Sequence, residues 1–291
     1  MEIAYYPGCT LKASSSLYDE QCKKIFSKLD INLIEIEDWN CCGATSAGKV
    51  DDFLAMAMPA RNIGIAENAG FAEMIIPCSA CYSRTLVAQK HIEDNNDFKK
   101  EINRTLANKV KGNIKITSIL EALLAKLESG ALAEKVEKKL KGIKAACYYG
   151  CLLTRFPCHI NIADDVENPQ AMEKIIKALG AKPLDWNYKT DCCGASAAVN
   201  DEDTALSLMA KIMKDAVERN ANCFVVACPM CQFNMDAYQD RFCEINNINK
   251  RLPVYFITEL TGLAFGVKIE ELHIDGHFVN CMPLLKELNL L

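Results

Sequence analysis

The sequence predicts an α/β protein built from two similar halves, and three observations lead to that prediction. A pattern of five cysteines occurs twice, once in each half of the 291-residue chain. In both halves, short apolar segments alternate with segments of helical periodicity, an order typical of parallel sheets. Every cysteine group follows an apolar segment, so we expect the groups of each half to meet at one sheet edge, where ligands of such sheets bind.

The first half begins with a strand at the N-terminus and then alternates helix and strand. Its expected strands are apolar runs at residues 3–6, 31–36, 74–76 and 114–117. Its expected helices carry apolar residues at helical spacing and cover residues 14–29, residues 51–68 and a segment that starts at residue 81. The highly charged segment 127–141 ends this unit.

The second half repeats this order, with expected strands at residues 145–149, 183–186, 224–226 and 255–258. Helices are expected at residues 171–179 and 203–218. The two units are therefore residues 1–142 and 143–291, each of ordinary domain size. Such a duplication predicts two Rossmann-like halves related by a pseudo-two-fold axis, with the ten cysteines of the pattern, and any metal clusters that they bind, near the interface.

Composition and charge exclude several classes of protein. The net charge of −5 and the lack of a basic block give no support for nucleic-acid binding. No apolar run reaches the roughly 18–20 residues of a membrane span, and residues 1–7 resemble a strand rather than a signal peptide. We therefore expect a cytoplasmic protein. The clusters among its sixteen cysteines are then expected to bind metal, because disulfides are rare in a reducing cytosol.

Each half offers one lone cysteine, one vicinal Cys-Cys-Gly and one Cys-x-x-Cys. The candidate metal ligands are Cys9, Cys41, Cys42, Cys78 and Cys81 in the first half, and Cys151, Cys192, Cys193, Cys228 and Cys231 in the second. A tetrahedral zinc site and a cubane iron–sulfur cluster each use four protein ligands, so either would leave one thiol idle in both halves. Five matched thiols favour a larger iron–sulfur assembly in which divergent adjacent cysteines reach two metals, and zinc stays as the alternative.

This repeated pattern resembles the B subunit of the heterodisulfide reductase of methanogens, over nearly the whole chain and at ten motif positions. The resemblance implies that each half binds one non-cubane [4Fe–4S] cluster through its five cysteines. It also implies reduction of the mixed disulfide of coenzyme M and coenzyme B (CoM-S-S-CoB). The electrons would come from the flavin-containing A subunit through the ferredoxin-like C subunit of the same complex.

The same repeat also occurs in iron–sulfur subunits of glycolate and lactate oxidation complexes and of an atypical succinate dehydrogenase or fumarate reductase. The alternative function is therefore electron transfer in a hydroxyacid or succinate/fumarate oxidoreductase complex. Many of those proteins fuse the repeat to a ferredoxin region, whereas this chain contains no Cys-x-x-Cys-x-x-Cys-x-x-x-Cys-Pro run. That difference favours the stand-alone B subunit.

Cleavage of a disulfide takes two electrons and two protons, and both coenzymes carry anionic groups. The candidate residues for binding those anions are Lys12, Arg84 and Arg155, each a few residues beyond a cysteine of the pattern. His159 is the candidate proton donor. A solvated surface charge is the plain alternative for each of the four.

The fifth ligand of the second half is open to more than one assignment, because two further cysteines flank the lone one. Cys151 is the expected ligand, since it follows the Tyr-Tyr-Gly sequence that matches the first half. Cys147 and Cys158 are then expected to be spectators.

Overall fold

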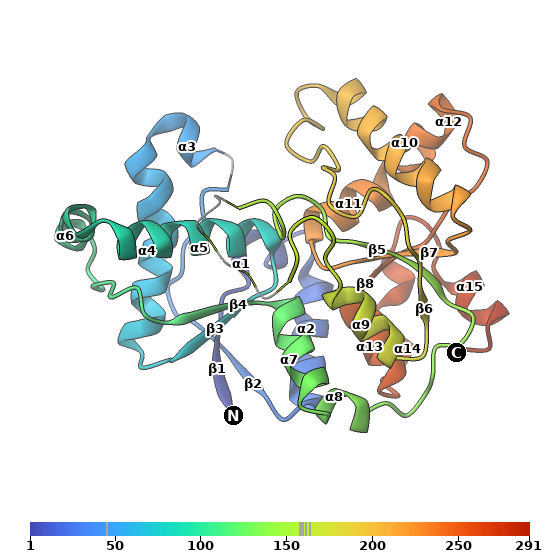
Figure 1. The fold of residues 1–291 in the computed structure, drawn as a ribbon, viewed down its shortest axis with the longest axis horizontal. Helices are drawn as coiled ribbons and strands as arrows, with labels where there is room; N and C mark the ends of the chain where they lie inside the picture. Colours follow the sequence, from blue (N-terminus) through green and yellow to red (C-terminus); the bar gives the residue numbers. More distant parts are fainter. Residues whose placement is uncertain (45, 157–159, 161, 163) are drawn as a thin grey trace.

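A computed structural model describes residues 1–44, 46–156, 160, 162 and 164–291. Within these residues, eight strands form two separate sheets of four parallel strands, one in each half of the chain (Figure 1). The strand order is β2-β1-β3-β4 in the first sheet and β6-β5-β7-β8 in the second. In both sheets the strands of the half lie in the order second, first, third, fourth. The predicted α/β architecture with duplicated halves is therefore confirmed.

The first half contains every strand and helix that the sequence predicts there. Its strands are β1 Glu2–Tyr5, β2 Asn32–Glu35, β3 Glu73–Ile76 and β4 Lys115–Ser118. Its helices are α1 Gly8–Leu11, α2 Ser16–Lys28, α3 Ala47–Val50, α4 Asp52–Asn68, α5 Ser79–Asp94, α6 Asn96–Thr105, α7 Ile119–Glu128 and α8 Ala131–Glu134. The Asp51 carboxylate accepts a hydrogen bond from the Leu54 N–H, which caps α4 at its start.

The second half follows the same plan. Its strands are β5 Lys144–Tyr148, β6 Lys182–Pro183, β7 Cys223–Val226 and β8 Val254–Phe256. Its helices are α9 Ala171–Ala178, α10 Glu202–Glu218, α11 Pro229–Ala237, α12 Gln239–Ile245, α13 Ile257–Ala264, α14 Ile269–Leu272 and α15 Met282–Glu287. Asp201 caps α10 as Asp51 caps α4. Strand β6 is shorter than expected, because the chain then leaves the sheet and the indole N–H of Trp186 donates to the Cys147 carbonyl.

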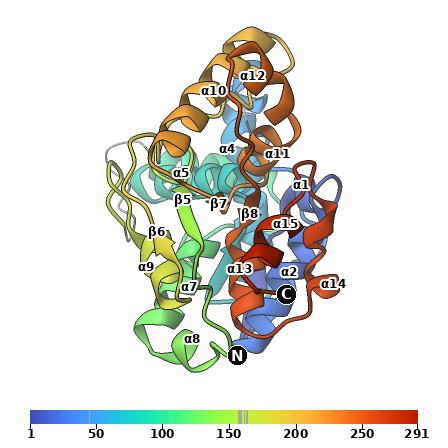
Figure 2. The ribbon, with the colours of Figure 1, turned by 90° about the vertical axis from the view of Figure 1, so that its right-hand side faces the viewer.

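Two helix pairs join the halves. Helix α2 packs against α13, and α7 packs against α9, so these four helices lie between the two sheets (Figures 1 and 2). Helices α2 and α9 each precede the second strand of their half, while α7 and α13 each follow the fourth. Each pair therefore joins the helix before the second strand of one half to the helix after the fourth strand of the other half, as a pseudo-two-fold axis requires.

Buried hydrogen bonds reinforce one of these contacts. The Gln21 amide on α2 donates to the Glu259 carboxylate at 3.1 Å and accepts from the Thr258 hydroxyl at 2.9 Å. The Tyr18 hydroxyl donates to the Ala227 carbonyl at 3.0 Å. Because buried polar groups that lose a partner are costly, these bonds fix the position of one half on the other.

The core of each half is the buried sheet and the helices that cover it. The central strands β3 and β7 are rich in Ile and Val, as expected of parallel strands covered on both faces. None of the helices in the described ranges is both long enough and apolar enough to traverse a bilayer.

Candidate metal centre

The cysteine groups follow the carboxyl ends of the strands and meet at one cavity between the halves. Cys9 and Cys78 come soon after β1 and β3, and Cys151 and Cys228 come soon after β5 and β7. The cavity measures about 280 Å³. Nine cysteines of the pattern line it, namely Cys9, Cys42, Cys78, Cys81, Cys151, Cys192, Cys193, Cys228 and Cys231. The two five-cysteine sets thus face a common space.

The lone cysteine of each half contacts the first cysteine of the vicinal pair. In the first half, Cys41 Sγ lies 3.7 Å from Cys9 Sγ, which places Cys41 next to the cavity lining. In the second half, Cys151 lies close enough to Cys192 to lower the pKa of Cys192. The separation of 3.7 Å suits two thiolates on one metal, because metal–sulfur bonds are about 2.3 Å long and the ligands are arranged tetrahedrally.

The second vicinal cysteine turns to a different partner, the last cysteine of the Cys-x-x-Cys. Cys193 Sγ lies 3.7 Å from Cys231 Sγ, and in the first half Cys42 lies close enough to Cys81 for that thiol to lower the pKa of Cys42. Adjacent cysteines therefore reach two separate positions in both halves, as the sequence predicts for an assembly with several metals. Within the described residues, no three Cys, His, Asp or Glu side chains converge on a position for a single ion. Five thiols in each half are a donor set that suits the thiolate ligation of an iron–sulfur cluster.

Thiol–thiol hydrogen bonds and nearby arginines favour the thiolate form at one member of each pair. A hydrogen bond from Cys81, aided by the charge of Arg84, lowers the pKa of Cys42 to about 7. A hydrogen bond from Cys151, aided by Arg155, lowers the pKa of Cys192 to about 6. Because the thiolate is the form that binds metal, the site is disposed to take up a cation.

Two glycines leave room for the sulfur atoms. Gly8 and Gly150 have positive φ angles of 75° and 67°. A Cβ atom at Gly8 would lie 2.6 Å from Cys81 Sγ, and one at Gly150 would lie 2.6 Å from Cys231 Sγ. Both the backbone conformation and the space therefore require glycine.

The sequence match aligns Tyr6 with Tyr149, but the structure makes Tyr6 equivalent to Tyr148. The Tyr6 hydroxyl donates to the carbonyl of Asn40 at 2.8 Å, and the Tyr148 hydroxyl donates to that of Asp191 at 2.7 Å. Each acceptor residue directly precedes a vicinal cysteine pair, so Tyr6 and Tyr148 are equivalent. Tyr149 therefore takes the position of Pro7.

Strand register explains why Cys147 lies apart from the cavity. Cys147 pairs with Val225 in the second sheet, as Tyr5 pairs with Ile75 in the first. Cys147 is fully buried within β5, whereas Cys151 lies on the cavity wall. Cys158 lies outside the described residues, so the choice of Cys151 as fifth ligand stays a prediction.

Tyr149 lines the cavity and is held by a buried ion pair that the sequence analysis missed. The Lys189 ammonium lies 2.7 Å from the Glu173 carboxylate, and their side chains are 7% and 9% exposed. Glu173 accepts the Tyr149 hydroxyl, which in turn accepts the Met172 N–H. Because the hydroxyl is engaged away from the cavity, Tyr149 contributes its ring to the wall. No local pattern links Glu173 to Lys189, which are distant in sequence.

The predicted cationic residues lie in different settings. Lys12 forms ion pairs with Glu35 at 2.6 Å and Asp19 at 3.4 Å, so its charge is already balanced. Arg84 is half-buried on α5 and Arg155 is exposed.

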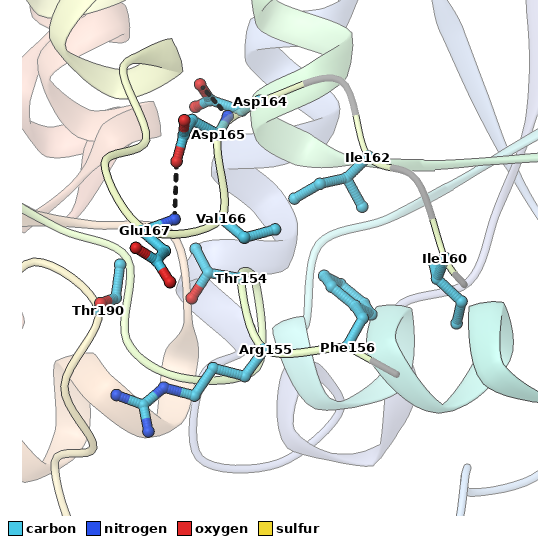
Figure 3. Close-up of a pocket in the computed structure, with 10 residues that line it drawn as sticks. All are labelled: Thr154, Arg155, Phe156, Ile160, Ile162, Asp164, Asp165, Val166, Glu167 and Thr190. Carbon is cyan, nitrogen blue, oxygen red and sulfur yellow. Dashed lines mark hydrogen bonds between the residues drawn. The ribbon is translucent and has the colours of Figure 1, made fainter. Parts of the chain in front are cut away.

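Arg155 borders a second cavity, of about 700 Å³, beside the cysteine site. Thr154 and Thr190 also line it, and the Arg155 side chain extends away from Asp164 and Asp165 (Figure 3). The candidate proton donor, His159, lies outside the described residues.

Comparisons with known proteins agree with this geometry. The cysteine-rich domain family CCG matches residues 3–84 and 145–236, one range in each half. The chain is 32% identical to the 8-methylmenaquinol:fumarate reductase membrane anchor subunit of Wolinella succinogenes, over 97% of this chain and 99% of the relative. It is 27% identical to the B subunit of the ferredoxin/F420H2-dependent CoB-CoM heterodisulfide reductase of Methanosarcina acetivorans, over 99% and 97% of the two chains.

A solved structure shares the fold. A hypothetical protein from Helicobacter pylori superposes with a TM-score of 0.75 at 13% identity, over 95% of this chain and 51% of that one. The present chain thus spans about half of that protein. Together with the ten thiols, the relatives support an iron–sulfur redox role. The chain belongs to the family of duplicated cysteine-rich CCG-domain proteins that includes the B subunit of heterodisulfide reductase.

Proposed function

We propose that this chain is the catalytic iron–sulfur subunit of a heterodisulfide-reductase complex and reduces CoM-S-S-CoB to its two thiols. The observation that carries the proposal is that both cysteine sets line one cavity. A substrate in that cavity touches both sets, so each sulfur of a disulfide meets one of them. The ligands would be the five pattern cysteines of each half.

The reaction joins one disulfide, two electrons and two protons to give two thiols. When bound, two non-cubane [4Fe–4S] clusters supply the electrons. The protein would hold the substrate between the two cysteine sets and limit its contact with water, since the cavity is lined by Ala80, Leu152 and Met230 beside the thiols.

Arg84 and Arg155 are the proposed anion-binding residues, one for each end of the substrate. Each lies close enough to a vicinal cysteine to favour its thiolate form. One cation per half suits a substrate with a sulfonate at one end and a phosphate at the other. Lys12 is less suited, because Glu35 and Asp19 already engage it.

A second function is favoured by the relative from Wolinella succinogenes, at 32% identity. Electron transfer in a quinol:fumarate reductase complex would also use both clusters. Apolar walls such as those formed by Leu152 and Met230 suit a quinol ring better than a disulfide with an anionic group at each end.

The complex would place this chain in the cytoplasm with two partners, the flavin-containing A subunit and the ferredoxin-like C subunit. The basis is the near-full-length similarity to the B subunit of heterodisulfide reductase. Co-purification of the native complex tests this assembly, and recovery of the chain without a flavoprotein would contradict it.

The metal content tests the proposal first. The anaerobically purified protein is expected to contain about eight irons and about eight sulfides per chain, four of each in each cluster. One or two zinc ions and no iron would refute it.

The substrate is tested on the native complex with reduced methyl viologen as electron donor. We expect CoM-S-S-CoB to be reduced, and Cys42→Ser or Cys193→Ser each to abolish the reaction, because one sulfur then has no intact cluster. Near-normal turnover by Cys42→Ser would contradict the joint action of both halves. Oxidation of the dye by fumarate but not by CoM-S-S-CoB would favour the second function.

A further inference from the structure

The two halves line the common cavity with side chains of different size. Beside its cysteines, the first half contributes Thr10, Ala44 and Ala80, and the second half contributes Tyr149, Leu152, Ala195, Ser196 and Met230. Because the halves are duplicated, a residue of one half can be compared with its equivalent in the other. Three such pairs are unlike, and they differ in the same direction.

The first unlike pair follows the lone cysteines, where Thr10 in the first half corresponds to Leu152 in the second. The same turn follows both cysteines, with the N–H three residues further on donating to the cysteine carbonyl at 3.2 Å in the first half and 3.4 Å in the second. Leu152 is the larger side chain. In line with this difference, Cys9 is exposed, whereas Cys151 is half-buried.

The second unlike pair lies within the Cys-x-x-Cys groups. Ala80 and Met230 each precede the last cysteine and lie in the first turn of a helix, α5 or α11. Both helices begin alike, because the N–H four residues beyond the first cysteine donates to its carbonyl at 2.9 Å in each half. Met230 therefore extends a long apolar side chain from a position where the first half has only a methyl group.

Tyr149 is the third bulky group of the second half, and Pro7 takes its position in the first. The Tyr149 hydroxyl is hydrogen-bonded to the Glu173 carboxylate and to the Met172 N–H, so the ring is held in the cavity wall and cannot easily move aside. In all three pairs the larger side chain belongs to the second half. The cavity is therefore narrower beside the second-half cysteines than beside the first-half cysteines.

We propose that the cavity has two unequal subsites, and that Tyr149, Leu152 and Met230 determine which arm of an asymmetric disulfide each subsite accepts. The narrow subsite, at the second-half cysteines, takes the shorter and slimmer arm. The wide subsite, at the first-half cysteines, takes the bulkier arm. The discrimination is steric, because the wrong orientation places the bulky arm against the three large side chains. The inference rests on the proposed function, since it requires that a disulfide is reduced in this cavity.

The test compares CoM-S-S-CoB with CoB-S-S-CoB, a disulfide with two long arms, as substrates of the native complex with reduced methyl viologen as donor. CoB-S-S-CoB should be a poor substrate of the wild type, because one long arm has to enter the narrow subsite. Met230→Ala should raise kcat/KM for CoB-S-S-CoB relative to CoM-S-S-CoB by about tenfold or more, since even one methylene group in an apolar pocket changes kcat/KM by about 10–200-fold.

The reverse change tests the wide subsite. Ala80→Met should lower kcat/KM for CoM-S-S-CoB by about tenfold, because the bulky arm then meets a long side chain in both subsites. The double variant Ala80→Met/Met230→Ala exchanges the two side chains and should recover part of that loss, with the substrate bound in the opposite orientation. A general disturbance of the fold would not be relieved by a second substitution in the other half.

Phe233→Ala is the matched control. Phe233 lies on the same helix as Met230 and is equally exposed, at 37% against 36%, but it is not part of the cavity lining. This variant should leave the relative kcat/KM of the two disulfides unchanged. Iron analysis of every variant shows whether both clusters are kept, and Met230→Ala only removes atoms, so its result stands even if Ala80→Met loses iron.

An unchanged ratio of the two kcat/KM values in Met230→Ala, or no recovery in an iron-loaded double variant, would overturn the inference, while reduction of CoM-S-S-CoB keeps the proposed function intact. An iron-loaded complex that reduces neither disulfide would instead refute the proposed function.

Discussion

His277 should contribute several kcal/mol to the stability of the second half, in a pH-dependent manner. Its Nε2 lies 2.7 Å from the Glu259 carboxylate, and its Nδ1 lies 3.4 Å from that of Asp236 and 3.0 Å from the Gln232 amide. The side chains of His277, Asp236 and Glu259 are 6%, 1% and 1% exposed. This cluster joins the C-terminal segment to α11, which carries Cys231, and to α13.

The size of the effect follows from the pKa of His277. Burial alone would lower it, but the carboxylates of Glu259 and Asp236 prevail and raise it from 6.5 to about 10. A difference of roughly 3.5 units between the folded and unfolded pKa corresponds to about 5 kcal/mol, at 1.36 kcal/mol per pKa unit. Removal of one partner from a buried ion pair costs about 3–5 kcal/mol, which agrees. We expect His277→Gln to lower the free energy of unfolding by about 3–5 kcal/mol at pH 7.

The raised pKa of His277 determines how its contribution to stability changes with pH. A group whose pKa is raised by folding contributes fully below its unfolded pKa, here near 6.5, and loses that contribution as the pH rises through about 10. The difference between wild type and His277→Gln should therefore be largest near pH 6.5 and shrink toward pH 10. Denaturant unfolding of the anaerobic, iron-loaded protein across this range measures it.

His273→Gln is the matched control. Its imidazole lies 3.4 Å from Glu20 in an exposed pair, with side chains 39% and 61% exposed. Such pairs contribute about 0–1 kcal/mol, so this variant should unfold almost like the wild type. A constant difference between wild type and His277→Gln from pH 6.5 to pH 10 would refute the assignment of charge to His277.

Three further predictions concern the cysteine site and its supports. Gly8→Ala should lose the iron of the first half, because the added Cβ would clash with Cys81 Sγ. Gly70→Ala is the control: Gly70 also has a positive φ but has open space around it, so this variant should lose only about 1–2 kcal/mol of stability and keep its iron. Equal iron contents in the two variants would contradict the argument. Iron and sulfide analysis should show one cluster lost in Cys151→Ser and both kept in Cys147→Ser, and the reverse result would make Cys147 the ligand. Lys189→Met should lower the free energy of unfolding by about 3–5 kcal/mol, because the buried Glu173 carboxylate is left without a cation; a loss below about 1 kcal/mol in denaturant unfolding would contradict this.

Much of the fold could be predicted because its signals are local. Strand β3 is a run of buried apolar residues that ends at a cysteine, and α4 begins after a capping aspartate. The order of such elements is sufficient to indicate parallel sheets. The meeting of the cysteines at one cavity follows from their places after the strands.

The packing between the halves could not be predicted in this way. The contact of Tyr18 with the Ala227 carbonyl joins residues far apart in sequence, and neither residue shows a pattern of its own. The two motifs align naturally with Tyr5-Tyr6 opposite Tyr148-Tyr149. The strand register of the two sheets instead makes Tyr6 the equivalent of Tyr148. Register depends on the whole sheet, which a short motif does not contain.

The departures from symmetry bear most directly on function. A perfect duplication would present the same surface to both sulfurs of a disulfide, so a substrate with two different ends would bind equally well in either direction. In this chain the cavity wall has Tyr149 where the first half has Pro7, and the first Cys-x-x-Cys has Ser79 where the second has Pro229. Under the proposed function, such differences would give the two directions of binding unequal free energies. Under the proposed function, a duplicated scaffold with these few unlike positions would therefore bind an asymmetric disulfide preferentially in one orientation.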